Sequence, residues 1–232
     1  METDASLRRL ALMTGALYLL TIVAGIFAQT FVSQRLITGD AATTAANLLA
    51  HRSLYQAGFA VYLVEMASQV AATALFFSLL EPVSRPVALV SAFVGLTGCV
   101  VKTMARAFFI APLLVLSTPG LPGMSQQQLQ SLSYVLLEIN DKGAEIALVF
   151  FGFYALLNGF LVVRSTFLPR FLGVLGMCGG AGWLTFLYPP LGHRLFLLIV
   201  LLALIGSLAM IFWLLIKGVD AQRWKARAGR AP

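Results

Sequence analysis

Residues 195–216 read LFLLIVLLALIGSLAMIFWLLI, an uninterrupted run of 22 residues without a charged side chain. A helix rises about 1.5 Å per residue, so this run is long enough to cross the roughly 30 Å hydrocarbon core of a bilayer. In lipid every backbone N–H and C=O must be bonded within the segment itself, which a helix achieves. The run therefore predicts a transmembrane helix.

The rest of the chain has a similar composition. Hydrophobic residues make up 59% of the 232 positions, charged residues make up 11%, and the mean hydropathy is +0.90. Soluble domains usually contain about 25% charged residues, so the polar residues here are too few to cover a water-soluble globule. The composition indicates an integral membrane protein whose first partner is the lipid bilayer.

Five further apolar blocks of similar length precede this run. The six predicted spans are residues 10–32, 57–80, 86–110, 144–163, 168–187 and 195–216. No Gly- or Ser-rich linker and no run of charges divides the chain. The sequence therefore predicts an all-α integral membrane protein, a six-helix transmembrane bundle that forms one domain over residues 1–232.

The formal net charge of +7 is distributed unevenly across the membrane. Ten Lys and Arg residues fall on the side that holds both termini, and four fall on the other side. Loops rich in Lys and Arg stay in the cytoplasm, which predicts cytoplasmic N- and C-termini. Because these basic residues lie between spans and in the tail, they suit anionic lipid headgroups, and we expect no nucleic-acid partner.

The first long connection on the predicted outer side covers residues 33–56. Asp40, a residue type that caps helices, precedes an Ala-rich stretch that ends at His51. This pattern predicts a short helix outside the membrane. The alternative is that the loop merely connects two spans.

The second long connection covers residues 111–143. Its prolines predict the end of the third span; they are Pro112, Pro119 and Pro122. Ser125 followed by Gln128 resembles a capping box. Four apolar residues then recur at helical spacing, which predicts an amphipathic helix on the outer membrane face; they are Leu129, Leu132, Leu136 and Ile139. Here too, a plain connection is the alternative.

The fifth span is rich in glycine. Gly176 and Gly180 lie four residues apart, a spacing that lets helices approach closely. We interpret this pair as tight packing within the bundle rather than as a seam between two copies. The sequence does not indicate an oligomeric state.

Several short segments resemble an uncharacterised bacterial membrane family, a domain of unknown function. They are LYLLTIVAGIFA at 17–28, GDAA at 39–42, AN at 46–47, RS at 164–165, LPR at 168–170 and LGVL at 172–175. The resemblance implies a small helical bundle in a bacterial inner membrane. It implies no established activity, cofactor or catalytic residue.

Ionisable side chains inside the apolar blocks are costly in lipid, so each needs a partner or a use. In chain order, the polar candidates are Glu65 and Gln69 in the second span, Lys102 and Arg106 in the third, and Glu145 at the start of the fourth. Counting about 1.5 Å per residue from the cytoplasmic ends puts the four charged residues roughly 22–30 Å up, in the outer third of the core. Two acids and two bases at one level predict a charge-balanced cluster.

Two interpretations of this cluster stay open. As architecture, it is a set of salt bridges that fixes helix register, with Lys102 and Arg106 extending to the headgroups. As a ligand site, it is an outer-leaflet polar cavity. Lys102 and Arg106 would meet an anionic or polar head there, and Glu65 would balance their charge or carry a proton. Buried ion pairs stabilise little compared with apolar replacements, which favours use.

The sequence therefore predicts a non-enzymatic protein that binds or moves a small amphiphile or an ion through this cavity. An accessory or structural subunit and an enzyme for a lipid-like substrate are the alternatives. Hydrolase, zinc-protease and nucleotide-binding motifs are absent from the sequence, so no catalytic residue is assigned. We expect no cofactor and no metal, because the two cysteines lie apart in apolar blocks and both histidines lie near the outer interface.

Overall fold

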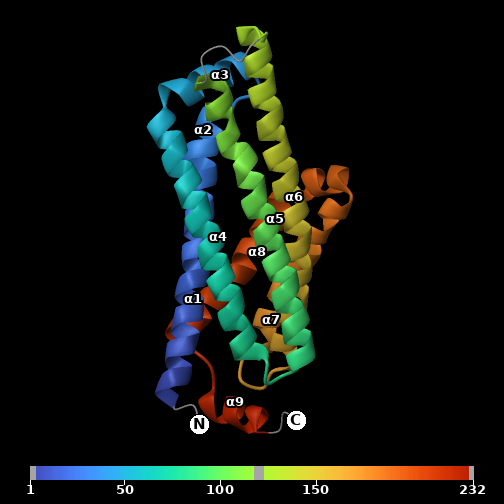
Figure 1. Ribbon diagram of the computed structural model, residues 1–232. Coiled ribbons are helices and arrows are strands. Elements are labelled where there is room, and N and C mark those ends of the chain that lie inside the picture. Colours follow the sequence, from blue (N-terminus) through green and yellow to red (C-terminus); the bar gives the residue numbers. More distant parts are fainter. Residues whose placement is uncertain (1–3, 118–122, 230–232) are drawn as a thin grey trace. The chain divides into compact units, whose positions relative to one another are not determined.

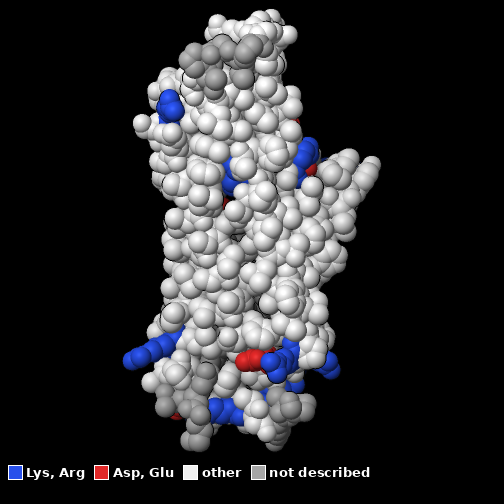
Figure 2. All heavy atoms as spheres, viewed as in Figure 1, with Lys and Arg blue, Asp and Glu red and all other residues white. Residues whose placement is uncertain are grey.

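The computed structural model describes residues 4–117 and 123–229. These residues are 90% helical and contain no strand, and six of their helices are long and apolar enough to cross a membrane. Large apolar side chains are widely exposed, such as Leu197 (73%) and Phe93 (63%). The face in Figure 2 is covered mostly by residues other than the charged ones. Surfaces of this kind suit lipid rather than water. The helical content and the lack of strands in the described residues confirm the predicted all-α class.

The elements in chain order are α1 (Asp4–Phe27), the π-helical segment η1 (Ala28–Ser33), α2 (Gln34–Leu36), α3 (Ala41–Ala50), α4 (Arg52–Leu80), α5 (Arg85–Ser117), α6 (Gln126–Arg164), α7 (Arg170–Leu184), the 3-10 turn η2 (Thr185–Leu187), α8 (Pro189–Ile216) and α9 (Ala221–Ala228) (Figure 1). The segments able to span are Asp4–Leu36, Arg52–Leu80, Arg85–Ser117, Gln126–Arg164, Arg170–Leu187 and Pro189–Ile216. Each predicted span lies inside one of these or begins within two residues of it. Most of the extra length lies at the predicted outer ends, because hydropathy marks only the apolar part of a helix.

The predicted end of the third span needs correction. Helix α5 does not stop at Pro112 but continues to Ser117. A proline removes one helical hydrogen bond, and neighbouring helices can compensate for it in a membrane protein. Here the Tyr55 hydroxyl of α4 donates a hydrogen bond to the backbone carbonyl of Phe109, next to the Phe108 carbonyl whose helical donor Pro112 removes. Pro119 and Pro122 lie outside the described residues.

The predicted amphipathic helix is also corrected, because its residues are the first part of the 39-residue helix α6. The capping box is confirmed: the Ser125 N–H donates to Gln128 Oε1 (2.7 Å), and the Gln128 N–H donates to Ser125 Oγ (3.3 Å). The helix continues through Gly143, where α5 lies close to it. A Cβ on Gly143 would lie 2.6 Å from the Cβ of Ala105.

The chain divides into two compact units, and each unit is assembled from separate stretches of sequence. The first unit comprises residues 1–20, 68–99 and 146–232, and the second comprises residues 21–67 and 100–145. The boundaries between them fall inside α1, α4, α5 and α6. Neither unit is a continuous segment of the chain. That residues 1–232 form one domain stays a prediction.

In the first unit, the short helix α9 packs against the end where α1 begins (Figure 1). The indole N–H of Trp224 donates to the Leu79 carbonyl (2.9 Å), and Lys225 pairs with Asp4 (2.6 Å). The Arg8 guanidinium donates to the carbonyls of Leu215 and Ile216 (both 3.1 Å) at the end of α8. Both ends of the described chain therefore lie on one side of this unit, and Figure 2 shows Lys and Arg side chains gathered around α9.

Helices α6 and α7 of the first unit touch backbone to backbone at four glycines. A Cβ on Gly159 would lie 2.6 Å from the Gly173 carbonyl oxygen, and a Cβ on Gly173 would lie 2.5 Å from the Gly159 carbonyl oxygen. Gly152 and Gly180 face each other in the same way, at 2.9 and 2.8 Å. Gly180 thus lies in the contact with α6, whereas a Cβ on Gly176 would meet nothing within 4 Å; the backbone of Gly176 instead lies near Gly206 of α8, whose added Cβ would be 3.4 Å from the Gly176 nitrogen.

The second unit has its own core, in which aromatic rings fill the space between α4 and α5. Tyr55 stacks on Phe109 (ring centroids 4.4 Å apart), and Tyr62 meets the same ring edge-on (5.3 Å). Helix α3 packs on this core through Leu48. Asp40 caps α3 by accepting a hydrogen bond from the Thr43 N–H (2.7 Å), which confirms the predicted N-cap. This unit holds the cluster of buried charges.

Candidate functional site

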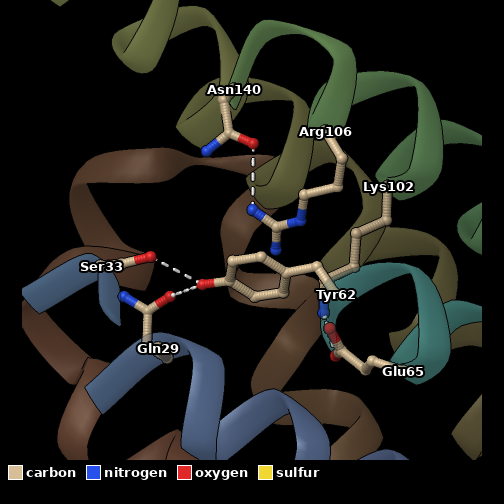
Figure 3. A network of polar contacts seen from close by, with 7 residues as sticks. All are labelled: Gln29, Ser33, Tyr62, Glu65, Lys102, Arg106 and Asn140. Atoms are coloured by element: carbon tan, nitrogen blue, oxygen red, sulfur yellow. Dashed lines mark hydrogen bonds and ion pairs between the residues drawn. The ribbon is translucent and has the colours of Figure 1, made fainter. Parts of the chain in front are cut away.

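A wide turn in the first span brings two polar side chains into the second unit. The helical segment widens from α to π geometry over η1 (Ala28–Ser33), a change that is frequent at functional sites. The Tyr62 hydroxyl donates to Gln29 Oε1 (2.9 Å) and shares a hydrogen bond with Ser33 Oγ (2.9 Å) (Figure 3). Two residues of η1 therefore hold the phenol of Tyr62 from one side.

Glu65 and Lys102 form the ion pair that the sequence predicts. Lys102 Nζ lies 2.6 Å from Glu65 Oε1, with 16% of the lysine side chain and 7% of the glutamate side chain exposed. Helix α1 comes close at the same oxygen, because a Cβ on Gly25 would lie 2.8 Å from Glu65 Oε1. The glycine therefore leaves the space that the carboxylate occupies, and the pair lies where little water reaches it.

Arg106 lies one turn further along α5 and is held differently. Its guanidinium lies over the Tyr62 ring, 3.6 Å from the centroid, and donates from Nη1 to Asn140 Oδ1 (3.0 Å) (Figure 3). The residue is 4% exposed. Among the described residues no carboxylate lies within ion-pair distance of Arg106. The aromatic face and the amide stabilise the cation in part, but neither neutralises it.

Two buried polar atoms of this network have no hydrogen-bond partner in the structure. They are Glu65 Oε2 and Arg106 Nε. Most buried polar atoms in folded proteins are paired, since leaving one unpaired costs about 1–3 kcal/mol. The network therefore contains one buried acceptor and one buried donor that no other described group satisfies.

The other two predicted site residues lie apart from this network. Gln69 donates to Thr73 Oγ1 (3.4 Å) one turn further along α4, within the first unit. Glu145 pairs with Lys142 on its own helix (3.0 Å), and that lysine side chain is 57% exposed. Of the five candidates, Glu65, Lys102 and Arg106 thus form the centre, while Gln69 and Glu145 interact elsewhere.

Four residues of the network were not predicted: Gln29, Ser33, Tyr62 and Asn140. A signal did exist for Gln29 and Ser33, which are polar and lie four residues apart, Gln29 inside the predicted first span and Ser33 directly after it. Uncharged residues are less costly in lipid than charged ones, so they attract less notice. Asn140 precedes the predicted fourth span and enters the site only because α6 starts so early.

A comparison with family models agrees with the resemblance seen in the sequence. The model for DUF4386, a domain of unknown function, matches residues 13–218. The chain belongs to the DUF4386 family. No curated protein and no solved structure matches this DUF4386 chain. Membership confirms the predicted kind of family and supplies no activity, so any function must be argued from the network itself.

Proposed function

We propose that this DUF4386 protein binds the anionic head of a small amphiphile through Lys102 and Arg106, at the outer leaflet of a bacterial inner membrane. The observation that carries the proposal is the buried Arg106 guanidinium, which has no carboxylate partner among the described residues and an unpaired Nε. A cation in such surroundings is costly unless an anion joins it. A bound headgroup would supply that anion.

The count of charges supports an anionic ligand. Glu65 neutralises Lys102 at 2.6 Å, so the buried part of the network holds one positive charge in excess. Asp141 comes nearest to balancing it: Asn140 accepts from Arg106 and donates to Asp141 (2.8 Å), and the Asp141 carboxylate also interacts electrostatically with the guanidinium. Asp141 forms no ion pair with Arg106 in the described part of the chain, so a ligand that brings its own anion closer to the guanidinium would balance more of the charge.

The expected depth of the network supports a headgroup rather than an acyl chain. Arg106 lies about 30 Å from the cytoplasmic end of its helix at 1.5 Å per residue, which is the thickness of the hydrocarbon core. Lys102 lies one turn deeper. The headgroup region of the outer leaflet begins at the level of Arg106, while the acyl chains would lie along the exposed apolar surface, which includes Met104 (64% exposed) on α5.

Thermal unfolding of the purified protein tests the proposal. We expect the melting temperature to rise when phosphatidylcholine is replaced by phosphatidylglycerol with the same acyl chains, because a ligand that binds only the folded state stabilises it. Arg106→Met should abolish this difference. Lys142→Met, which removes an exposed cation from the same unit, should preserve it. An equal response of the wild type to the two lipids would contradict the proposal and favour an architectural role for the cluster.

A further inference from the structure

The two unpaired atoms of the network, Glu65 Oε2 and Arg106 Nε, call for opposite partners. The guanidinium N–H needs an acceptor, and the carboxylate oxygen needs a donor. A bare anion would satisfy the guanidinium N–H but would be repelled by the carboxylate oxygen. A ligand that satisfies both must carry an anionic oxygen and, close to it, a group that donates a hydrogen bond.

We infer that the headgroup bound here is an anion flanked by a hydroxyl group, as in a glycerophosphate. This inference rests on the proposed function and names the chemistry of its ligand. The anionic oxygen accepts from Arg106 Nε, and the hydroxyl donates to Glu65 Oε2. No bond is made or broken, and the Lys102–Glu65 pair stays in place through Oε1.

The residues that carry the two unpaired atoms belong to one network. Arg106 lies one turn from Lys102 on α5, a rise of about 6 Å, and Lys102 contacts Glu65 directly. Figure 3 shows Arg106 on one side of the Tyr62 ring and the Lys102–Glu65 pair beside it.

The surroundings of Glu65 determine which of its oxygens is available. Oε1 already accepts from Lys102, and it is the atom of Glu65 that lies nearest to Gly25 of α1. Oε2 is buried without a partner. The donor must therefore approach Oε2, and a neutral hydroxyl suits this position better than an ammonium, because Lys102 and Arg106 would repel a third cation.

Three lipids with identical acyl chains test separately whether binding needs the negative charge, the hydroxyl group or an ammonium group. Phosphatidylglycerol has one negative charge and hydroxyls, phosphatidylmethanol has the charge alone, and phosphatidylethanolamine is a zwitterion with an ammonium donor. We expect thermal-shift titration in detergent micelles to give phosphatidylglycerol an affinity about tenfold higher than phosphatidylmethanol, the value of one hydrogen bond to a charged group. Phosphatidylethanolamine should bind least.

A charge-neutral double variant tests the role of Glu65. Glu65→Met with Lys102→Met removes the buried pair and keeps Arg106, so the two anionic lipids should bind equally and still better than phosphatidylcholine. The matched control is Lys142→Met with Glu145→Met, which removes a more exposed ion pair from the same unit and should keep the tenfold preference. Should the first variant not fold, soluble glycerol phosphate and methyl phosphate can be compared on the wild type. If glycerol phosphate stabilises the protein and methyl phosphate does not, the hydroxyl is needed and a free headgroup suffices without a lipid.

The outcomes distinguish this inference from the proposed function. Equal affinity of the wild type for phosphatidylglycerol and phosphatidylmethanol, both above phosphatidylcholine, would overturn the hydroxyl and leave anion binding intact. Stabilisation by phosphatidylethanolamine as strong as by phosphatidylglycerol would assign the donor to an ammonium and also overturn it. No preference for any anionic lipid would remove the proposed function itself.

Discussion

Tyr62 joins the separate parts of the network. Its ring lies under the Arg106 guanidinium, and its hydroxyl reaches Gln29 and Ser33 in the π-helical segment of the first span. One side chain thereby links α4, α5 and η1. We regard it as a positioning residue that orients Arg106 and does not itself meet the ligand.

Removing only the hydroxyl of Tyr62 tests this role. Tyr62→Phe should keep the ring under Arg106 and lower the free energy of unfolding by about 1–2 kcal/mol, because Ser33 Oγ loses a buried partner. It should also reduce the difference in melting temperature between phosphatidylglycerol and phosphatidylcholine. The control is Tyr18→Phe, which removes a hydroxyl bonded to Ser207 (2.6 Å) in the first unit. An equal lipid response in the two variants would mean that Tyr62 only stabilises the fold.

Among the elements, the contact of α6 with α7 makes the sharpest prediction. Gly173→Ala should lower the free energy of unfolding in detergent by about 1–3 kcal/mol, because the new methyl meets a backbone oxygen that cannot move aside. Gly176→Ala, three residues away with nothing within 4 Å, should be close to neutral. Similar losses from both substitutions, measured by denaturant titration, would contradict the backbone contact.

The start of α3 should depend on pH through its cap. The hydrogen bond from Thr43 holds the pKa of the Asp40 carboxyl below its usual value. The stabilisation is therefore complete above the pKa of the unfolded chain, about 3.9, and is lost as the pH falls through the lower folded pKa. Hydrogen exchange at Thr43, corrected for its intrinsic pH dependence, should lose protection over that range. Asp40→Asn, which also caps helices but does not titrate, should not show this loss.

The elements were largely predictable, because lipid requires long apolar helices and leaves few other patterns. The Glu65–Lys102 pair was predictable as well, since two charges at one depth need each other. The outer ends were not, because α5 and α6 continue past Pro112 and Gly143, residue types that usually end or weaken a helix. The partners of Arg106 could not be found either, since a π-helical turn and an early helix start bring them to it.

At the scale of the whole molecule, the charge distribution predicts the orientation in the membrane. The six spans and the pair of Asp4 with Lys225 agree with both ends lying on one side. The excess of basic residues there predicts that this side is cytoplasmic. Reporter fusions at the C-terminus and after Arg85 and Arg164 should therefore report a cytoplasmic location, whereas fusions at Thr43 and Gln127 should report a periplasmic one. A periplasmic C-terminus would reverse the leaflet assigned to the network.

The contacts that close the first unit, made by α9 with Leu79 and Asp4, also set an order of events during synthesis. A ribosome makes α1 long before Trp224 and Lys225, yet these residues meet Leu79 and Asp4 in the folded protein. The first span must therefore enter the bilayer well before its partners in α9 have been made. A nascent chain stalled after Ile216 would hold all six spans and still lack this closure, with the Leu79 carbonyl and the Asp4 carboxylate not yet bonded to the tail.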